Sequence, residues 1–253
     1  MGKDSIRLET CSTIQKLPRS GLLERTVIVV DVLRASSSII WAIKNGAAKV
    51  IPALEPGTAT ALSMKLGTHE CVLAGERGGR KMPGFALGNS PEEFIPRVVW
   101  GKNVIISTTN GTAAINAVQN AKHVLIGGMI NRTSVAKRAL EYGDDIIILC
   151  AGTDGMDSAD DLCAAGSIID AISRYADVPI TPSDMTLICS LLYADWKEGV
   201  ADLSTTHHYS HLVSLGMGSD VEFCLRQDMT TVVPEYLNGC INQRKENDLQ
   251  VLI

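Results

Sequence analysis

V-I-V-V-D-V-L-R-A-S-S-S-I-I, residues 27–40, is the stretch that decides the fold class of this chain. Four β-branched apolar residues lead into a short polar loop, and a helix-forming segment follows. A second stretch, N-V-I-I-S-T-T-N-G-T-A-A-I-N at 103–116, repeats the order of apolar strand, loop, hydroxyl residue and helix at an offset of 76. Short continuous apolar runs of this kind are typical of strands that are covered on both faces.

Strand and helix patterns alternate outward from these two stretches. The runs that we predict as strands are 27–30, 48–53, 103–106 and 146–150. The helical patterns between them cover about 36–45, 56–66, 112–120 and 131–141. This alternation predicts an α/β layered sheet.

The constant spacing of the two halves indicates an internal duplication. V-L-A-G-E-R-G (72–78) matches L-C-A-G-T-D-G (149–155) at an offset of 77. We therefore predict a duplicated βαβαβ unit, with halves at about 26–100 and 101–176, inside a single α/β domain that covers 1–253. Chance similarity between α/β segments is the alternative, and the nearly constant offset favours duplication.

The C-terminal region, about 181–253, has a different pattern. S-D-M-T-L-I-C-S-L-L-Y-A-D-W (183–196) has the pattern of an amphipathic helix capped by its first serine. V-V-P-E-Y-L-N-G-C-I (232–241) has the pattern of a hairpin that turns at its Asn-Gly pair. We interpret this region as a lid or as the surface of a homodimer.

Composition excludes several classes of function. The net charge of −5 and the 4% aromatic content argue against nucleic acid as a partner. Seven cysteines without a C-x-x-C pair are read as buried thiols in a reducing compartment. The N-terminus lacks the apolar core of a signal peptide, and no apolar run reaches the roughly 18 residues of a membrane span. We expect a cytoplasmic protein with no membrane partner.

The loop S-T-T-N-G-T (107–112) places many small donors between a buried strand and a helix. Ligands of open α/β sheets gather at the carboxyl ends of strands. The start of a helix there offers free N–H groups and the positive end of its dipole. Capping of the helix is the alternative, but a cap needs only one such residue. The residues that we predict to form an anion cradle are Thr108, Thr109, Asn110, Gly111 and Thr112.

Acidic and basic residues gather near the other predicted strand ends. Asp31 follows the first strand, Arg34 can fork onto a phosphate or carboxylate, and Ser36 can cap the next helix. The glycine-rich loop 75–91 carries Glu76 with several cations, among them Arg77, Arg80 and Lys81. A loop of this length is either functional or a solvated, flexible flap.

The loop A-G-T-D-G-M-D-S-A-D-D (151–161) adds four aspartates at another strand end. Asp160 and Asp161 can simply complement the N-terminus of the following helix. Taken with Asp31 and Glu76, however, they form a set of carboxylates that suits a hard cation such as Mg²⁺. An anion cradle beside a Mg²⁺ site indicates phosphate chemistry.

Three histidines give a weaker, rival interpretation. His207 and His211 have the i, i+4 spacing of a zinc pair, with His208 between them. No glutamate lies between them, and the intervening residues resemble an ordinary helix surface. The P-loop, G-x-G-x-x-G and G-x-S-x-G motifs are absent at the expected places, which argues against P-loop kinases, dinucleotide oxidoreductases and α/β-hydrolases.

Several ordered motifs resemble those of the 2-phosphosulfolactate phosphatase (ComB) family. They are D-V-L-R-A-S (31–36), A-G-E-R-G-G (74–79), G-F-A-L-G-N-S-P (84–91), T-T-N-G-T (108–112), D-D-L-C-A-A-G (160–166), L-G-M-G-S-D-V-E-F-C-L-R-Q-D (215–228) and V-V-P (232–234). The resemblance runs from about 26 to 241. Asp160 stands where the family has glutamate, and Ala86 stands where an acidic residue is usual, so we assign no role to Ala86.

The resemblance implies a three-layer α/β/α fold with a largely buried mixed sheet. It also implies a Mg²⁺-dependent phosphatase that converts 2-phospho-3-sulfolactate to 3-sulfolactate and phosphate, in a pathway of the coenzyme M type. The partner is then a small anionic phosphate ester. A non-catalytic binder of an anionic metabolite and another Mg²⁺-dependent phosphoryl-transfer enzyme remain alternatives.

The residue patterns and the resemblance together predict catalytic, metal-binding and substrate-binding roles for individual residues. The predicted catalytic residues are Asp31, Arg34 and Asp161, and the predicted Mg²⁺ ligands are Asp31, Glu76 and Asp161. The predicted substrate-binding residues are Arg34, Ser36, Arg77, Asn89, Ser90, Thr108, Thr109, Asn110, Gly111 and Thr112. Asp31 is the first candidate for the base or nucleophile, and attack by water or by an aspartate is left open.

Overall fold

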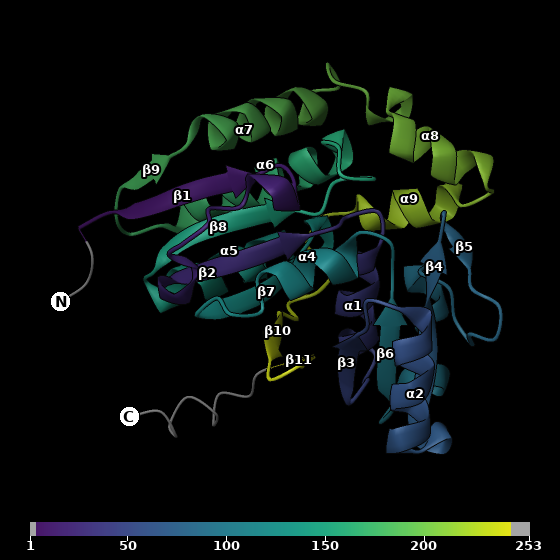
Figure 1. Cartoon of the computed structure of the whole chain (residues 1–253). Helices are drawn as coiled ribbons and strands as arrows, with labels where there is room; N and C mark the ends of the chain where they lie inside the picture. Colours follow the sequence, from purple (N-terminus) through teal and green to yellow (C-terminus); the bar gives the residue numbers. More distant parts are fainter. Residues whose placement is uncertain (1–3, 244–253) are drawn as a thin grey trace.

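The computed structural model describes residues 4–243, which fold around an 11-stranded mixed sheet (Figure 1). The order of the strands is β5-β4-β6-β3-β11-β10-β7-β2-β8-β1-β9. The strands are β1 (Ile6–Cys11), β2 (Arg25–Val30), β3 (Lys49–Pro52), β4 (Cys71–Arg77), β5 (Arg80–Lys81), β6 (Asn103–Ser107), β7 (His123–Gly127), β8 (Asp145–Cys150), β9 (Ile180–Pro182), β10 (Pro234–Leu237) and β11 (Cys240–Gln243).

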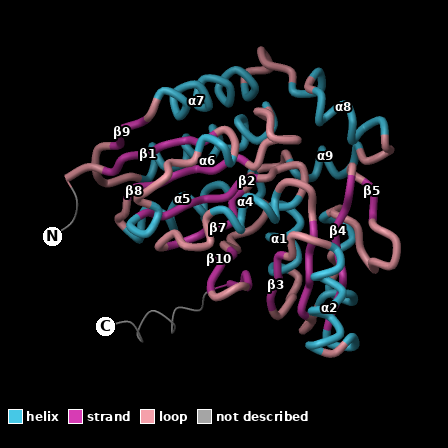
Figure 2. The backbone as a smooth tube through the Cα atoms, in the orientation of Figure 1, coloured by secondary structure: helices cyan, strands magenta, loops and turns pink. Residues whose placement is uncertain are grey.

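Helices cover both faces of the sheet, so the fold is a three-layer α/β/α arrangement, as the resemblance implied (Figure 2). The helices are α1 (Ala35–Lys44), α2 (Pro56–Leu66), α3 (Pro96–Val99), α4 (Gly111–Ala117), α5 (Arg132–Tyr142), α6 (Ala159–Tyr175), α7 (Asp184–Lys197), α8 (His207–Ser214) and α9 (Gly218–Cys224). All four strands and all four helices predicted from the alternating pattern are confirmed, with ends that differ by a few residues.

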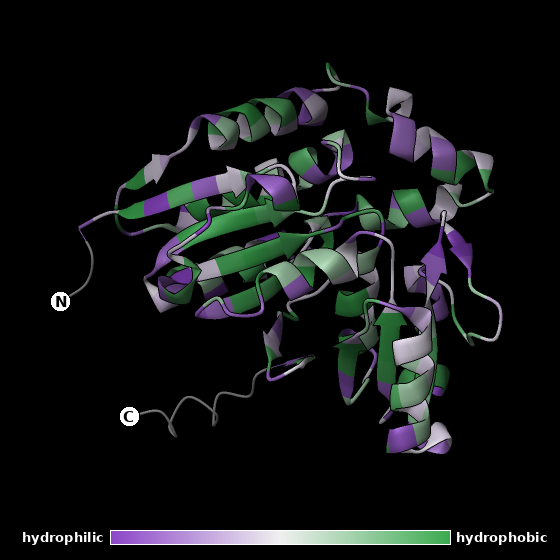
Figure 3. Ribbon diagram, in the orientation of Figure 1, coloured by the Kyte–Doolittle hydropathy of each residue, from purple (hydrophilic) through white to green (hydrophobic). Residues whose placement is uncertain are grey.

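Apolar strand residues account for the buried centre of the sheet. Val27–Val30 of β2 and Ile146–Cys150 of β8 are almost fully buried, and the two strands pair in parallel. Both runs are continuous because helices cover the strands on each face. Figure 3 shows the same pattern, with hydrophobic strands inside and hydrophilic residues on the outer helices.

Two parallel blocks of strands make up the sheet. β4, β6 and β3 form one block, while β7, β2, β8, β1 and β9 form the other. The hairpin of β10 and β11 joins them and runs antiparallel to its neighbour on each side. In Figure 1 the strands of one block lie across those of the other.

The predicted repeats interlock within this sheet. β2, from the first half, lies between β7 and β8 of the second half. β6, from the second half, lies between β3 and β4 of the first. The order βαβαβ therefore occurs twice, with the first strand of each unit placed in the other block. The evolutionary duplication itself stays a prediction.

The two elements predicted in the C-terminal region are confirmed, but the hairpin lies within the sheet between β3 and β7, so the interpretation of it as part of a lid or dimer surface is wrong. The side chain of Ser183 accepts a hydrogen bond from the backbone N–H of Thr186 and caps α7. The hairpin turns at Asn238 and Gly239, which have φ values of 51° and 85°. Two positive φ values in succession are the requirement of a tight hairpin turn that Asn-Gly meets.

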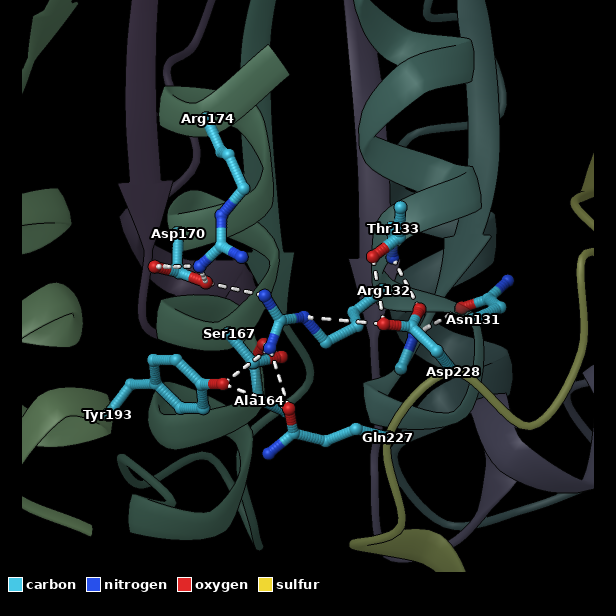
Figure 4. Close-up of polar contacts among 11 residues, drawn as sticks. Asn131, Arg132, Thr133, Ala164, Ser167, Asp170, Arg174, Tyr193, Gln227 and Asp228 are labelled. Carbon is cyan, nitrogen blue, oxygen red and sulfur yellow. Dashed lines mark hydrogen bonds and ion pairs between the residues drawn. The ribbon is translucent and has the colours of Figure 1, made fainter. Parts of the chain in front are cut away.

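A buried arginine ties the segment after α9 to the helices (Figure 4). Arg132, the first residue of α5, forms an ion pair with Asp170 of α6 and donates hydrogen bonds to Tyr193 of α7 and to Gln227. Next to it, Asp228 accepts hydrogen bonds from the backbone and side chain of Thr133. These contacts fix the chain that leads away from α9.

All seven cysteines lie in the described part of the chain and are free thiols, and five are buried as expected, whereas Cys71 and Cys240 are only half-buried. Burial raises the pKa of the Cys163 and Cys189 thiols to about 12, so they remain protonated and behave as apolar core residues. Within residues 4–243, no helix is both long and apolar enough to cross a membrane.

Candidate active site

A cavity of about 340 Å³ opens where the loops after β2, β4 and β6 come together. Six residues predicted from the sequence line it: Asp31, Arg34, Glu76, Asn89, Thr109 and Asn110. The loop after β8 and helix α8 complete the wall. The interlocked blocks therefore bring the strand ends of both halves to one place.

Asp31 follows β2 and is held by the first turn of α1. Its Oδ1 accepts a hydrogen bond from the backbone N–H of Ala35 at 3.2 Å. The hydroxyl of Ser36 accepts one from the backbone N–H of Asp31 at 2.9 Å and donates one to the carbonyl of Val29. Ser36 is therefore a buried support of the Asp31 loop and does not line the cavity.

The protonation of Asp31 is shifted by its surroundings. Burial raises its pKa from 3.8 to about 6, and the negative charges of Glu76 and Asp160 act in the same direction. The charge of His208 and the hydrogen bond from Ala35 oppose the rise. A carboxyl with a pKa near 6 can accept a proton at neutral pH more readily than an ordinary aspartate.

Glu76 joins the loops after β4 and β6. Its Oε2 accepts a hydrogen bond from the backbone N–H of Gly79 at 2.7 Å, and its Oε1 accepts one from the backbone N–H of Thr109 at 2.9 Å. One carboxylate thus fixes two walls of the cavity.

Two of the backbone N–H groups expected to form an open anion cradle at 108–112 are already bonded to other groups of the protein. The N–H of Thr109 is occupied by Glu76, and the N–H of Thr112 donates to the hydroxyl of Thr108. The hydroxyl of Thr112 in turn donates to the carbonyl of Thr108. Both threonines are buried and satisfy the loop itself, because hydroxyls close to free backbone groups bond to them first.

Gly111 has a different use in the same loop. A Cβ atom at this position would lie 2.6 Å from Asp31 Oδ2 and 2.6 Å from the Cβ of Ala35. Only glycine lets α4 approach the Asp31 loop this closely. Asn110 lines the cavity, and its side-chain oxygen accepts a hydrogen bond from the backbone N–H of Asp154.

Arg34 is buried in the cavity wall and is already paired. Its Nη1 lies 2.5 Å from Asp220 Oδ2, and its Nη2 donates to the carbonyl of Gly79 at 2.8 Å. Ser90 donates from its hydroxyl to the other oxygen of Asp220. Sequence reasoning assigned Arg34 and Ser90 to the substrate and missed Asp220, which holds both of them.

Asn89 and Arg77 have contrasting positions. Asn89 lines the cavity, is buried, and its side-chain oxygen has no hydrogen-bond partner. Arg77 turns away from the cavity lining and donates to the carbonyls of Glu76 and Leu54 and to the hydroxyl of Ser107. Arg77 supports the ends of β4 and β6 instead.

Asp161 lies behind the cavity, at the start of α6. Its Oδ1 accepts a hydrogen bond from the backbone N–H of Val32 at 2.8 Å, and its Oδ2 accepts one from that of Gly152 at 3.0 Å. It therefore joins the loops after β2 and β8. Burial raises its pKa well above the ordinary value, and the charges of Asp31 and Asp160 add to the rise.

Three histidines form one wall of the cavity, and the sequence analysis did not assign them to the active site. His207, His208 and His211 of α8 all line the cavity. Nδ1 of His208 lies 3.1 Å from the hydroxyl of Thr153 and 3.4 Å from Oδ2 of the buried Asp160. The only sequence feature that pointed to these residues was three histidines within five positions, and their spacing suggested a metal-binding pair.

Comparison with known proteins assigns the family. The model of the family described as 2-phosphosulpholactate phosphatase matches residues 11–239. The chain belongs to the 2-phosphosulpholactate phosphatase family.

Similar proteins cover nearly the whole length of this family member. A probable 2-phosphosulfolactate phosphatase of Clostridium novyi (strain NT) is 36% identical over 231 residues, which are 91% of this chain and 97% of that protein. One of Caldanaerobacter subterraneus subsp. tengcongensis is 36% identical over 240 residues, 94% and 99% of the two chains. One of Clostridium beijerinckii is 35% identical over 238 residues, 93% and 99%.

Two of the acidic residues that line the cavity are suitable ligands for Mg²⁺, but the three predicted ligands do not come together. Among the described residues, no three His, Cys, Asp or Glu side chains converge as a ligand set, so the predicted trio with Asp161 is not assembled. Asp31 and Glu76 nevertheless line the same cavity. Mg²⁺ commonly takes one or two carboxylates, substrate phosphate and several waters, and this pair fits that mode.

Proposed function

We propose that this protein is a Mg²⁺-dependent phosphatase that hydrolyses 2-phospho-3-sulfolactate to 3-sulfolactate and phosphate, in a pathway of the coenzyme M type. Membership of the family and the names of its relatives support the reaction. The observation that carries the assignment to this cavity is the pair of buried carboxylates, Asp31 and Glu76, at the meeting point of the strand ends.

The charge around the cavity supports the need for a cation. Four carboxylates are buried in or directly behind its wall: Asp31, Glu76, Asp160 and Asp161. Arg34 is the buried cation beside them, and it is already neutralised by Asp220. A substrate with phosphate, carboxylate and sulfonate groups would add further negative charge, which is costly at a partly desolvated site unless positive charge accompanies it.

Asp31 and Glu76 are the residues that would hold Mg²⁺. When bound, the cation would neutralise the charge on the phosphate oxygens as the ester bond breaks. Their backbone supports, Ala35, Thr109 and Gly79, keep the two carboxylates in place before the substrate enters. Such preorganisation is the usual source of electrostatic stabilisation in enzymes.

The other residues of the cavity would bind and orient the ester. Asn89 presents a buried side-chain amide whose oxygen has no hydrogen-bond partner among the residues that the structure describes. Arg34 presents its guanidinium in a direction fixed by Asp220 and Gly79. Asp31, with its raised pKa, is the group that would accept the proton of an attacking water or itself attack phosphorus.

Product analysis tests this function against its alternatives. Purified protein is stripped of metal with a chelator and supplied with 2-phosphosulfolactate, with or without added Mg²⁺. We expect equal amounts of sulfolactate and phosphate with Mg²⁺ and neither without it. Binding with no phosphate release would indicate a non-catalytic binder, and phosphoryl transfer only to an added acceptor would indicate a transferase. Full activity after exhaustive chelation would refute the Mg²⁺ requirement.

A further inference from the structure

His208 is built into the cavity by contacts on one side of its ring. It is the second residue of α8, and its side chain is 18% exposed at the cavity wall. Nδ1 lies 3.1 Å from Thr153 Oγ1 and 3.4 Å from Asp160 Oδ2. The loop after β8 and the start of α6 therefore hold the Nδ1 side of the imidazole.

Asp160 is an unusual neighbour because the two oxygens of its buried carboxylate have different kinds of partner. Its Oδ1 accepts a hydrogen bond from the hydroxyl of Ser158 at 2.8 Å. Its Oδ2 is buried and accepts no hydrogen bond from residues 4–243, but Nδ1 of His208 lies 3.4 Å from it as an ion-pair partner. A buried carboxylate oxygen without a hydrogen bond is costly, and a charged His208 ring offsets that cost.

The hydroxyl network decides which nitrogen of the ring carries a fixed proton. The Thr153 hydroxyl donates toward Ser158, which leaves its oxygen free to accept from His208. Both groups near Nδ1 are then acceptors, so Nδ1 keeps its proton in either charge state of the ring. Nε2 is consequently the nitrogen that gains and loses a proton.

We propose that His208 is the general acid of the reaction, which gives its Nε2 proton to the ester oxygen as that oxygen leaves phosphorus, and that Asp160 is the positioning residue that keeps the ring charged. The inference rests on the proposed phosphatase function. It adds a catalytic residue on the α8 side of the cavity. His208 donates a proton, whereas Asp31 accepts a proton from water or attacks phosphorus.

Every proton that is transferred has a donor and an acceptor, whether water or Asp31 attacks phosphorus. The bond between phosphorus and the 2-oxygen of the substrate breaks, its electron pair stays on that oxygen, and the oxygen takes the Nε2 proton. If water attacks, Asp31 accepts the water proton, and proton exchange with solvent restores both residues. If Asp31 attacks, water then hydrolyses the aspartyl phosphate and returns one proton to His208.

The charges near His208 favour the protonated ring. The groups that share its surroundings are Asp160, Asp31, Arg34, Glu76, Asp154, His207 and His211. Burial alone would lower the pKa of His208, but the nearby carboxylate of Asp160, and then the charge of Asp31, outweigh it, so the pKa is raised. The positive charge of Arg34 opposes this rise. More of the ring is therefore charged at neutral pH than in an ordinary histidine.

The test compares pH profiles of kcat/KM for 2-phosphosulfolactate, with Mg²⁺ present. We expect the wild-type profile to fall on the alkaline side as His208 loses its proton. His208→Asn should lower kcat about a hundredfold or more and abolish that alkaline fall, in line with the usual contribution of a general acid. Asp160→Asn should move the alkaline fall to lower pH, because it removes the charge that stabilises the imidazolium.

Controls separate catalysis from folding. His208→Gln supplies a second variant, and thermal unfolding of each protein shows whether it is intact. Ser214→Asn, at an exposed position of the same helix, should behave as wild type. An intact His208→Asn protein that keeps wild-type kcat, or that is slower but keeps the alkaline fall, would overturn this inference alone. Wild-type protein that releases no phosphate would overturn the proposed function and the inference with it.

Discussion

Arg34 Nη1 lies 2.5 Å from Asp220 Oδ2, although 186 residues separate the two in the chain. The side chains are 3% and 5% exposed, so the pair is buried. The second arm of the guanidinium is occupied by the carbonyl of Gly79. The arginine that the sequence marked as a ligand for phosphate is therefore also a structural link between the Asp31 loop and α9.

Arg34→Ala should damage both stability and activity. A role in substrate binding alone would predict a loss of at least tenfold in kcat/KM with thermal stability almost unchanged. The buried partner changes the second expectation, because removal of one member of a buried pair typically costs about 3–5 kcal/mol. Urea unfolding measures the loss, and Arg34→Ala/Asp220→Ala should be more stable than Arg34→Ala alone. An unchanged unfolding midpoint in the single variant would contradict the structural role.

Gly111→Ala should disturb catalysis through contact with Asp31. The added methyl group would meet Asp31 Oδ2 and the Cβ of Ala35, each at 2.6 Å, so the Asp31 loop or α4 must shift. Overpacking of this kind costs about 1–3 kcal/mol. We expect kcat to fall at least tenfold. Gly57→Ala is the matched control, since a Cβ there meets nothing within 4 Å, and it should leave kcat unchanged. Equal kcat values for both variants would show that catalysis does not require the close approach of α4 to the Asp31 loop.

The stability of the metal-free protein should depend on the charge of Asp31. Its folded-state pKa is raised from 3.8 to about 6. The folded protein thus binds the proton more tightly than the unfolded chain, and this contribution to stability is complete below pH 3.8 and lost as the pH rises through about 6. The rise corresponds to about 3 kcal/mol. Relative to Asp31→Asn, the wild type should therefore lose stability between about pH 4 and 7.

Urea unfolding in the presence of a chelator measures this difference. Asp195→Asn, at an exposed site, is the control and should show a constant difference from wild type. Addition of Mg²⁺ at pH 7 should stabilise the wild type and have little effect on Asp31→Asn. If the difference in the free energy of unfolding between wild type and Asp31→Asn does not vary with pH, Asp31 is not the group that makes stability depend on pH.

Local pattern was sufficient to predict four of the strands, five of the helices and the hairpin turn. The runs at 27–30 and 146–150 are apolar because both faces of β2 and β8 are covered, and that signal is local. The positions of Asp31 and Glu76 at strand ends could likewise be read from the sequence. The α/β class followed from the alternation of strand and helix patterns, and the three-layer arrangement followed from the family resemblance.

Pairings between distant residues could not be read in the same way. The role of Ser36, Thr108 and Thr112 as internal supports depends on which backbone groups lie free beside them. The placement of Asp161 behind the cavity depends on the approach of two loops from different strands. Such contacts arise from the tertiary arrangement, and a single sequence contains no record of them.

The kcat of Asp31→Asn for phosphate release from 2-phosphosulfolactate shows whether Asp31 takes part in the reaction. Asparagine preserves the size of the side chain and an oxygen for the N–H of Ala35 while it removes the charge and the basic group. We expect an intact, folded protein whose kcat is reduced more than a hundredfold, which corresponds to about 2.7 kcal/mol of lost transition-state stabilisation. A folded Asp31→Asn protein with wild-type kcat would contradict the assignment of the reaction to this cavity.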